Sequence, residues 1–233
     1  MNNAEFIDLG IIGYRDAWKI QYELHEKIYL NRNHNPFYLI FCEHPHVYSL
    51  GKNGKKSNLL INNDYMKGIN AEFVETDRGG DITYHGPGQI VGYPIIDLNA
   101  SGYGIKNYVS KLEESVINTL KEFNIESTRI SGATGVWIKG SDKPDRKICA
   151  IGVKVSRWIT MHGFAFNINT NLKYFNFINP CGFTDKGVTS LSEELGFYPD
   201  VNEVKNILKI NLSQQLNLNL KQKERENGKE MDF

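Results

Sequence analysis

The sequence has few cysteines and no long apolar run. Its 233 residues include three cysteines, Cys42, Cys149 and Cys181, and none of them stands in a Cys-x-x-Cys spacing. An odd number without that spacing argues against both a disulfide framework and a zinc ribbon, so we expect free thiols. No apolar stretch reaches the roughly 18 residues of a membrane-spanning helix. The sequence therefore predicts neither a disulfide-rich protein nor a membrane protein.

An excess of either charge is also missing. The 27 lysines and arginines are balanced by 27 acidic residues, so no overall field attracts nucleic acid. Aromatic residues interleaved with basic ones, which single-stranded nucleic acid would need, are mostly absent. The first residues have neither a signal-peptide pattern nor an Arg-rich amphipathic one. We expect a cytoplasmic protein that binds neither nucleic acid nor a membrane.

Two segments are basic within this neutral chain. Residues 50–68 hold four lysines against Asp64, and residues 139–157 hold six basic residues against Asp142 and Asp145. Such runs are usually solvated loop faces. The alternative is that they dock an acidic partner protein.

Composition favours one globular domain. The chain is 40% hydrophobic and 12% aromatic, and we find no internal repeat, low-complexity segment or dividing linker. We expect a single domain over residues 1–220, an α/β fold with a mixed sheet, followed by a charged tail over 221–233.

Hydrophobic periodicity gives a coarse order of elements. The opening has a βαβ pattern, with strands at 6–12 and 37–42 around a helix at 16–29. Further expected elements are strands at 69–74, 90–96 and 135–138, paired strands at 148–155 and 159–168, and helices at 109–123 and 201–216.

The segment 78–89, RGGDITYHGPGQ, has four glycines in twelve positions. Glycine is tolerated where φ is positive or where a backbone must approach a ligand closely. The segment looks too polar and rich in turns to be core. Together with its arginine, tyrosine and histidine, the glycine density predicts a binding loop.

Cys181 is the candidate nucleophile. It stands in an Asn-Pro-Cys-Gly turn, where rigid Pro180 and permissive Gly182 can present the sulfur at a fixed angle. Cys42 and Cys149 lie in apolar strands and are expected to pack in the core. A neighbouring cation or base would activate the thiol, and the candidates are Lys147, His85 and His162. Spacing alone does not choose among these three.

Small residues recur on one face of each paired strand. Alternation places Ala150 with Gly152, and Gly163 with Ala165. Small faces would leave room for a slender acyl chain, but close packing explains them equally well. The segment 51–57 lacks P-loop spacing, and His44-Pro45-His46 has no obvious further ligands, so neither predicts a phosphate or metal site.

Segment 78–89 and the following VGYPIIDL at 91–98 closely resemble the signature of the lipoyl(octanoyl) transferase family. The resemblance continues in family order through most of residues 6–196. The remaining motifs are EHP at 43–45, TGVW at 134–137, KICAIG at 147–152, MHGFA at 161–165, NPCG at 179–182 and GVTSL at 187–191. A long polar loop before Lys147 departs from the family pattern.

The resemblance implies a catalytic pair of Lys147 and Cys181, and so selects the lysine over the histidines. It also implies a fold similar to the catalytic domain of biotin and lipoate ligases. The substrate-binding residues that it implies are Arg78, Gly79, Gly80, Asp81, Ile82, Thr83, Tyr84, His85, Ala150, Ile151, Gly152, Gly163, Phe164 and Ala165.

The activity that the resemblance implies is octanoyl or lipoyl transfer in lipoate biosynthesis, without a cofactor. The donor would be octanoyl-acyl carrier protein, and a Cys181 thioester would be the intermediate. The acceptor would be a lysine of the lipoyl domains of 2-oxoacid dehydrogenase complexes or of the glycine cleavage H protein, and the enzyme a monomer. Two alternatives are an ATP-dependent lipoate-protein ligase, which needs no nucleophilic cysteine, and a non-catalytic module that binds carrier proteins.

Overall fold

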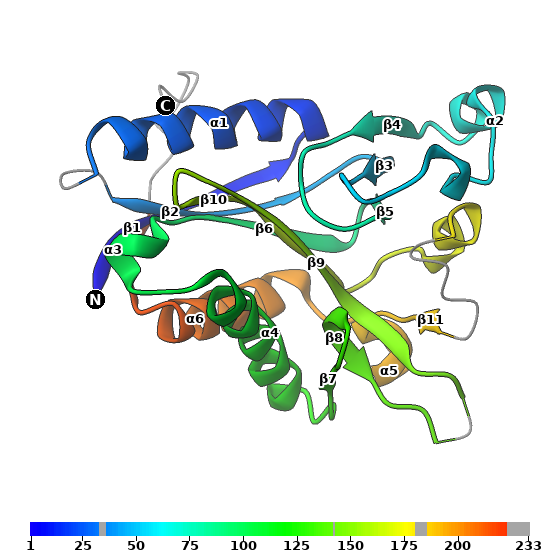
Figure 1. Ribbon diagram of the computed structural model, residues 1–233. Helices are drawn as coiled ribbons and strands as arrows, with labels where there is room; N and C mark the ends of the chain where they lie inside the picture. Colours follow the sequence, from blue (N-terminus) through cyan, green and yellow to red (C-terminus); the bar gives the residue numbers. More distant parts are fainter. Residues whose placement is uncertain (33–35, 142, 180–185, 223–233) are drawn as a thin grey trace.

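The computed structural model describes residues 1–32, 36–141, 143–179 and 186–222. Helices cover both faces of a large twisted sheet, and a small sheet lies at its side (Figure 1). The strands are β1 (Asn2–Ile11), β2 (Phe37–Glu43), β3 (Val47–Leu50), β4 (Glu72–Glu75), β5 (Ile82–His85), β6 (Gln89–Ile95), β7 (Thr128–Ile130), β8 (Ala133–Ile138), β9 (Arg146–Ser156), β10 (Ile159–Asn167), β11 (Gly187–Val188) and β12 (Leu218–Gln222). The helices are α1 (Tyr14–Leu30), α2 (Asn63–Gly68), α3 (Leu98–Ser101), α4 (Ile105–Glu122), α5 (Leu191–Leu195) and α6 (Val201–Gln215), with 3-10 turns η1 (Lys56–Asn58) and η2 (Leu172–Phe177).

The large sheet is mixed. Its order is β12-β1-β2-β6-β10-β9-β8-β7, with β11 paired to β9 off this path. Strand β1 runs parallel to both β2 and β12, while the pairs from β2 through β6, β10, β9 and β8 to β7 are antiparallel. The mixed α/β fold and the βαβ opening are therefore confirmed.

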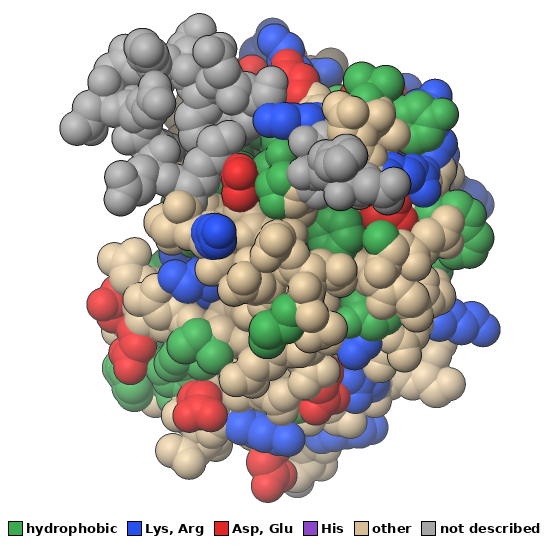
Figure 2. Space-filling view, turned by 90° about the vertical axis from the view of Figure 1, so that its left-hand side faces the viewer, with side chains coloured by type: hydrophobic (Ala, Val, Ile, Leu, Met, Phe, Trp, Pro, Cys, Tyr) green, Lys and Arg blue, Asp and Glu red, His purple; other side chains and the backbone are tan. Residues whose placement is uncertain are grey.

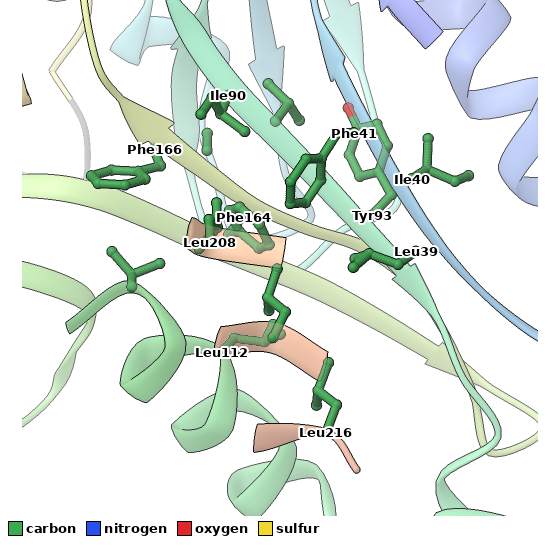
Figure 3. Packing of buried hydrophobic residues seen from close by; sticks show 14 of the residues in the cluster. Leu39, Ile40, Phe41, Ile90, Tyr93, Leu112, Phe164, Phe166, Leu208 and Leu216 are labelled. Atoms are coloured by element: carbon green, nitrogen blue, oxygen red, sulfur yellow. The ribbon is translucent and has the colours of Figure 1, made fainter. Parts of the chain in front are cut away.

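Helices α4 and α6 cover one face of this sheet and α1 covers the other (Figure 1). On α4 the buried residues Tyr108, Leu112, Val116 and Leu120 recur every fourth position, which forms one apolar stripe. Figure 3 shows Leu112, with Leu208 and Leu216, beneath the strands that carry Leu39, Phe41 and Phe164. This packing fixes β6, β9 and β10, the strands on which the site is built.

The segment 78–89 is not the exposed loop that its composition suggests. Ile82–His85 forms strand β5, which pairs antiparallel with β3 in a small sheet of order β4-β3-β5. Tyr84 is fully buried and stacks on Tyr174 with ring centroids 4.9 Å apart. The glycines lie at the two ends of the segment, so its centre is free to follow strand geometry. The expectation of a loop is therefore confirmed for the ends alone, and whether the segment binds a ligand stays a prediction.

Several element boundaries also differ from expectation; β1 and α4, for example, begin four residues earlier, at Asn2 and Ile105. The strand expected at 69–74 begins at Glu72, because helix α2, capped by the Asn62 side chain, extends to Gly68 and Asn70 takes a positive φ of 51°. At the carboxyl end, β12 reaches Gln222, two residues into the expected tail, since it pairs in parallel with β1. The rest of that tail lies outside the described residues.

The surface seen from the left of Figure 1 carries basic, acidic and hydrophobic side chains interspersed with one another (Figure 2). No sign dominates the part of this face that the structure describes, in keeping with the neutral composition. Among the described residues, no helix is both long enough and apolar enough to cross a membrane.

Candidate active site

A cavity of about 510 Å³ lies against β9 and β10. Segment 78–89 and the chain on both sides of 180–185 supply other parts of its wall. The predicted site residues that line it are Arg78, Gly80, Asp81, Ile82, Thr83, His85, Lys147, Ala150, Ile151, Gly152, Gly163, Phe164 and Ala165. Gly79 and Tyr84 do not line it, and Cys181 lies outside the described residues. Whether the lining residues bind substrate stays a prediction.

The cavity has two chemically different ends. Lys147 and Gly152 both line it from β9, and a strand rises about 3.3 Å per residue, so they lie about 16 Å apart. Around Lys147 the wall includes Trp137 and Val188, the residues that flank it in the sheet. Near Gly152 the wall holds Arg78, Tyr14, Tyr93 and His162. A chain running along β9 would therefore pass from the lysine end to a polar, aromatic end.

Lys147 is held by strands on both sides. Its Cα partners are Trp137 of β8 and Val188 of β11, and its carbonyl accepts a hydrogen bond from the Thr189 backbone N–H at 3.0 Å. The ammonium nitrogen lies 4.8 Å from the centre of a Trp137 ring, within cation–π range. The Trp137 indole and the pairing of Lys147 with both neighbouring strands thus set the position of the Lys147 amine.

Gly135 makes room beside this lysine. The β8–β9 register shifts between Val136 and Trp137, and Gly135 has a φ of +125°. A Cβ at Gly135 would lie 2.5 Å from the Cys149 carbonyl oxygen and 3.4 Å from Lys147 Cε. Both the conformation and the contacts require glycine there.

The predicted small faces do meet. In the β9–β10 ladder Gly152 stands opposite Gly163, and Ala150 stands opposite Ala165. The protein's own backbone fills the space of the missing side chains at both glycines, however. A Cβ at Gly152 would lie 2.8 Å from Gly79 O, and one at Gly163 would lie 2.1 Å from Gly92 O. Close packing therefore explains the glycines, and the alanines are left as the small residues facing the cavity.

Arg78 anchors segment 78–89 to the small sheet. Its Nη2 donates to Ser49 O at 2.6 Å and to Ser49 Oγ at 3.0 Å, and its Nε donates to the same hydroxyl at 3.3 Å. Nη1 donates to Gly79 O at 3.0 Å. Arg78 is 7% exposed, so these acceptors replace the water that its guanidinium has lost. Next to it, Gly79 N donates to Val153 O, which ties the segment to β9.

A chain of buried polar side chains continues from Ser49. Its hydroxyl lies 3.0 Å from His85 Nε2, and His85 Nδ1 lies 2.9 Å from Gln89 Oε1. The Gln89 amide then donates to Asn167 Oδ1 at 2.8 Å, and Asn167 Nδ2 donates to Thr189 O at 2.9 Å. This chain of hydrogen bonds therefore extends from the Gly-rich segment to Thr189, whose backbone N–H donates to the Lys147 carbonyl.

His85 is not placed to act as a base. Burial, and then the charges on His44 and Arg78, hold its pKa well below the ordinary value. Both ring nitrogens are already engaged in the polar chain. His85 is thus a neutral structural link in the cavity wall.

His162 faces the far end of the cavity. Its Nε2 lies 2.9 Å from Asp77 Oδ1, and it has an unusual φ of +57°. Burial lowers the pKa of His162, although the contact with Asp77 opposes this. Burial acts the other way on Asp77, but hydrogen bonds from His162, Lys154 and Tyr22 hold the pKa of that carboxyl below its usual range. His162 therefore belongs to a polar cluster at the end of β9 remote from Lys147.

Several lining residues escaped the sequence interpretation. Tyr14, Tyr93, Trp137 and Asn167 all line the cavity but stand in segments read as strands or at the edge of a helix. Tyr93 and Trp137 occur within the family-like motifs, which was a usable signal. Asn167 at the end of an apolar strand was another, because a buried amide needs partners.

The remaining cysteines and histidines have structural roles. Burial raises the pKa of the Cys42 and Cys149 thiols above the ordinary value, which makes both poor nucleophiles, as expected of core residues. His44 contacts Ile12 O through Nδ1 at 2.8 Å and the Tyr93 hydroxyl through Nε2 at 2.7 Å. His46 Nδ1 lies 2.7 Å from the Tyr84 hydroxyl.

His44 predicts a loss of stability in mild acid. Burial lowers its pKa to about 4, whereas in the unfolded chain it titrates near its ordinary 6.5. Between these values only the unfolded chain binds the proton, so stability falls as the pH drops. From pH 7.5 to 5 we expect His44 to remove about 2 kcal/mol from the free energy of unfolding. Urea unfolding at both pH values should show a smaller difference in His44→Gln than in the wild type. An equal difference would contradict the assignment.

Comparison with known proteins gives one family and consistent relatives. The family model described as the lipoyl protein ligase A/B catalytic domain matches residues 13–213. An octanoyltransferase of Bacteroides thetaiotaomicron is 49% identical over 214 residues, which cover 91% of this chain and 94% of that protein.

Similar solved structures share the fold at low sequence identity. The bipartite lipoate protein ligase of Thermoplasma acidophilum superposes with a TM-score of 0.71 at 15% identity, covering 96% of this chain and 87% of that one. Biotin protein ligase of Aquifex aeolicus gives 0.51 at 13% identity, covering 93% and 70%. The expected likeness to biotin and lipoate ligase catalytic domains is therefore confirmed at the level of the fold.

Proposed function

The chain belongs to the lipoyl protein ligase A/B catalytic domain family and, within it, to the octanoyltransferases, and we propose that it works through an acyl-enzyme. It is an acyltransferase that transfers octanoyl groups in lipoate biosynthesis. The proposal concerns the mechanism of this transfer. Cys181 takes the octanoyl group from octanoyl-acyl carrier protein, and a lysine of a lipoyl domain then receives it.

One observation carries the proposal. Asn179 and Lys186, the described residues that flank segment 180–185, both line the cavity that Lys147 lines. The described residues on both sides of the segment that contains Cys181 therefore lie at the cavity wall. An acyl group bound along Ala150 and Ala165 would have its carbonyl near the lysine end.

In the first step the Cys181 thiolate attacks the carbonyl carbon of the carrier thioester. The carbon–sulfur bond to the carrier breaks, and the leaving carrier thiolate takes a proton from the Lys147 ammonium, which leaves Lys147 neutral. Lys147 as a cation favours the thiolate beside it. One thioester replaces another, so this step is nearly isoenergetic.

In the second step the amine of the acceptor lysine attacks the acyl-enzyme. An amide forms, the thioester breaks, and Lys147 in its neutral form accepts the proton that the amine loses. Because an amide is more stable than a thioester, the transfer is favourable without ATP. Backbone N–H groups near the site would stabilise the oxyanion of both steps.

The proposed partners are an acyl carrier protein and the lipoyl domains of 2-oxoacid dehydrogenase complexes or the glycine cleavage H protein. The reaction needs Cys181 as a free thiol, which a reducing compartment preserves, so we place the enzyme in the cytoplasm. No cofactor has a part in this scheme, and we expect one protomer to be sufficient. The chief rival is ATP-dependent ligation, because the solved relatives with this fold include ligases.

The test is intact-protein mass spectrometry after mixing with octanoyl-acyl carrier protein in the absence of ATP. We expect an octanoyl adduct on the wild type and none on Cys181→Ser. Cys42→Ala is the matched control, since Cys42 is buried away from the cavity, and it should keep the adduct.

Two results would contradict the proposal. An adduct that persists in Cys181→Ser would place the acyl group on another residue. Transfer that requires ATP and free octanoate would instead make the protein a ligase.

A further inference from the structure

The direction of every hydrogen bond in the buried polar chain is fixed from its two ends. The guanidinium of Arg78 can only donate, and its Nε and Nη2 occupy both acceptor positions of Ser49 Oγ. At the other end of the chain, the backbone carbonyls of Tyr84 and Thr189 can only accept, so Gln89 and Asn167 turn their NH₂ groups towards them. Gln89 Oε1 then faces a proton on His85 Nδ1, and His85 Nε2 accepts from Ser49 Oγ. We assign this tautomer from the network.

The side-chain amides of Gln89 and Asn167 continue the same order of donors and acceptors. With its oxygen turned to His85, Gln89 presents its NH₂ group to Tyr84 O and to Asn167 Oδ1, at 3.2 Å and 2.8 Å. Asn167 must then present its own NH₂ group to Thr189 O. All of Ser49, His85, Gln89, Asn167 and Thr189 are at most 5% exposed, so water does not substitute for a lost partner.

The last hydrogen bond of this polar chain reaches Thr189, next to β11, a strand too short to keep its position through its own pairing. Strand β11 has two residues, and its pairing with Arg146 and Lys147 is continued by Thr189 N donating to Lys147 O. Asn167 binds the carbonyl of the same Thr189 from β10. This amide links β11 to a strand other than β9, and β11 directly follows the segment that contains Cys181.

We propose that Asn167 is a positioning residue for acyl transfer, which holds β11 in register with Lys147 by donating a hydrogen bond to the Thr189 carbonyl. The inference rests on the proposed roles of Lys147 and Cys181. Asn167 acts through β11 and needs no contact with the reacting atoms. A displacement of about 1 Å at such a site can lower a rate about 100-fold.

Asn167→Asp tests this with almost no change in shape. At pH 8 the new carboxylate cannot donate to Thr189 O, and we expect acyl-enzyme formation to be about 10- to 100-fold slower, with the KM for octanoyl-acyl carrier protein within about twofold. When protonated, the carboxyl donates again through its O–H. Burial raises the pKa of a carboxyl group, so the rate relative to the wild type should recover as the pH falls from 8 towards 5.5.

Asn169→Asp is the matched control. Asn169 lies two residues away, does not line the cavity, and donates through Nδ2 to a backbone carbonyl, Pro199 O, at 3.1 Å. It should lose comparable thermal stability but keep the wild-type rate at every pH. Gln89→Glu is a second variant within the chain, because its carboxylate would face Asn167 Oδ1, and it should show the same recovery in acid.

The outcomes separate the two proposals. Equal rate profiles for Asn167→Asp and Asn169→Asp would overturn the positioning role, and so would a raised KM with unchanged kcat, which would mean that Asn167 contacts substrate. The rate of each variant is compared with the rate of the wild type, and both are measured with the donor that the wild type uses. If the wild type formed no adduct in the absence of ATP, that result would contradict the proposed acyl-enzyme. It would not bear on the positioning role of Asn167.

Discussion

Lys147→Met is expected to slow formation of the acyl-enzyme by at least about 100-fold while leaving the fold intact. Methionine keeps the length and the apolar stem that lies beside Gly135 and Trp137, but it removes the charge and the proton acceptor. Loss of a general acid or base of this kind typically lowers a rate by about 10² to 10⁴. Single-turnover mass spectrometry with octanoyl-acyl carrier protein measures the acylation rate directly.

Lys139→Met is the control for this change. The Lys139 side chain is 66% exposed and forms a surface ion pair with Asp145 at 3.3 Å, a short distance before β9. We expect its acylation rate to stay within about twofold of the wild type. If Lys147→Met acylated as fast as Lys139→Met, Lys147 would have no part in the first step.

Gly135→Ala is the second change with a large expected effect. Alanine must adopt a φ of +125° and place its Cβ against the Cys149 carbonyl oxygen, or β8 must separate from β9 beside Lys147. We expect a loss of about 2 kcal/mol or more in the free energy of unfolding. Because the separation occurs where Lys147 pairs with Trp137, acylation should also fall by at least about tenfold. Urea unfolding and single-turnover acylation measure the two effects.

Gly102→Ala distinguishes this local effect from the general strain of positive φ. Gly102 has a φ of +70° at the end of α3, and a Cβ there would meet nothing within 4 Å. It should lose about 1 kcal/mol and no activity. Equal losses of rate in the two variants would show that the space beside Lys147 is unimportant.

Local sequence patterns predicted much of the scaffold. The every-fourth-residue stripe of α4 and the apolar run of β2 depend on neighbours in sequence, and both elements formed as expected, although α4 begins four residues earlier. The turn at 156–158 likewise placed β9 and β10 as a pair. The sequence placed Ala150 and Ala165 on the small faces of these strands, and the structure shows them opposite each other.

The missed features depend on contacts distant in sequence. Strand β5 forms because β3, more than 30 residues earlier, supplies its partners, and this pairing buries residues that composition marks as polar. The close packing at Gly163 required knowing that Gly92 lies beside it. The polar chain is harder still to foresee, since Ser49, His85 and Asn167 come from three separate strands. The assignment of Cys181 as the nucleophile rests on sequence alone, because this residue lies outside the described residues.

The parallel pairing of β1 with β12 has a consequence for how the chain reaches its native state. These strands contain Asn2 and Leu218, so their contact has one of the largest sequence separations that the chain allows. During synthesis β12 emerges more than 200 residues after β1, and until then β1 presents an unpaired edge able to join another strand. High contact order also slows folding. The arrival of β12, rather than any element close to β1 in sequence, therefore closes this side of the sheet.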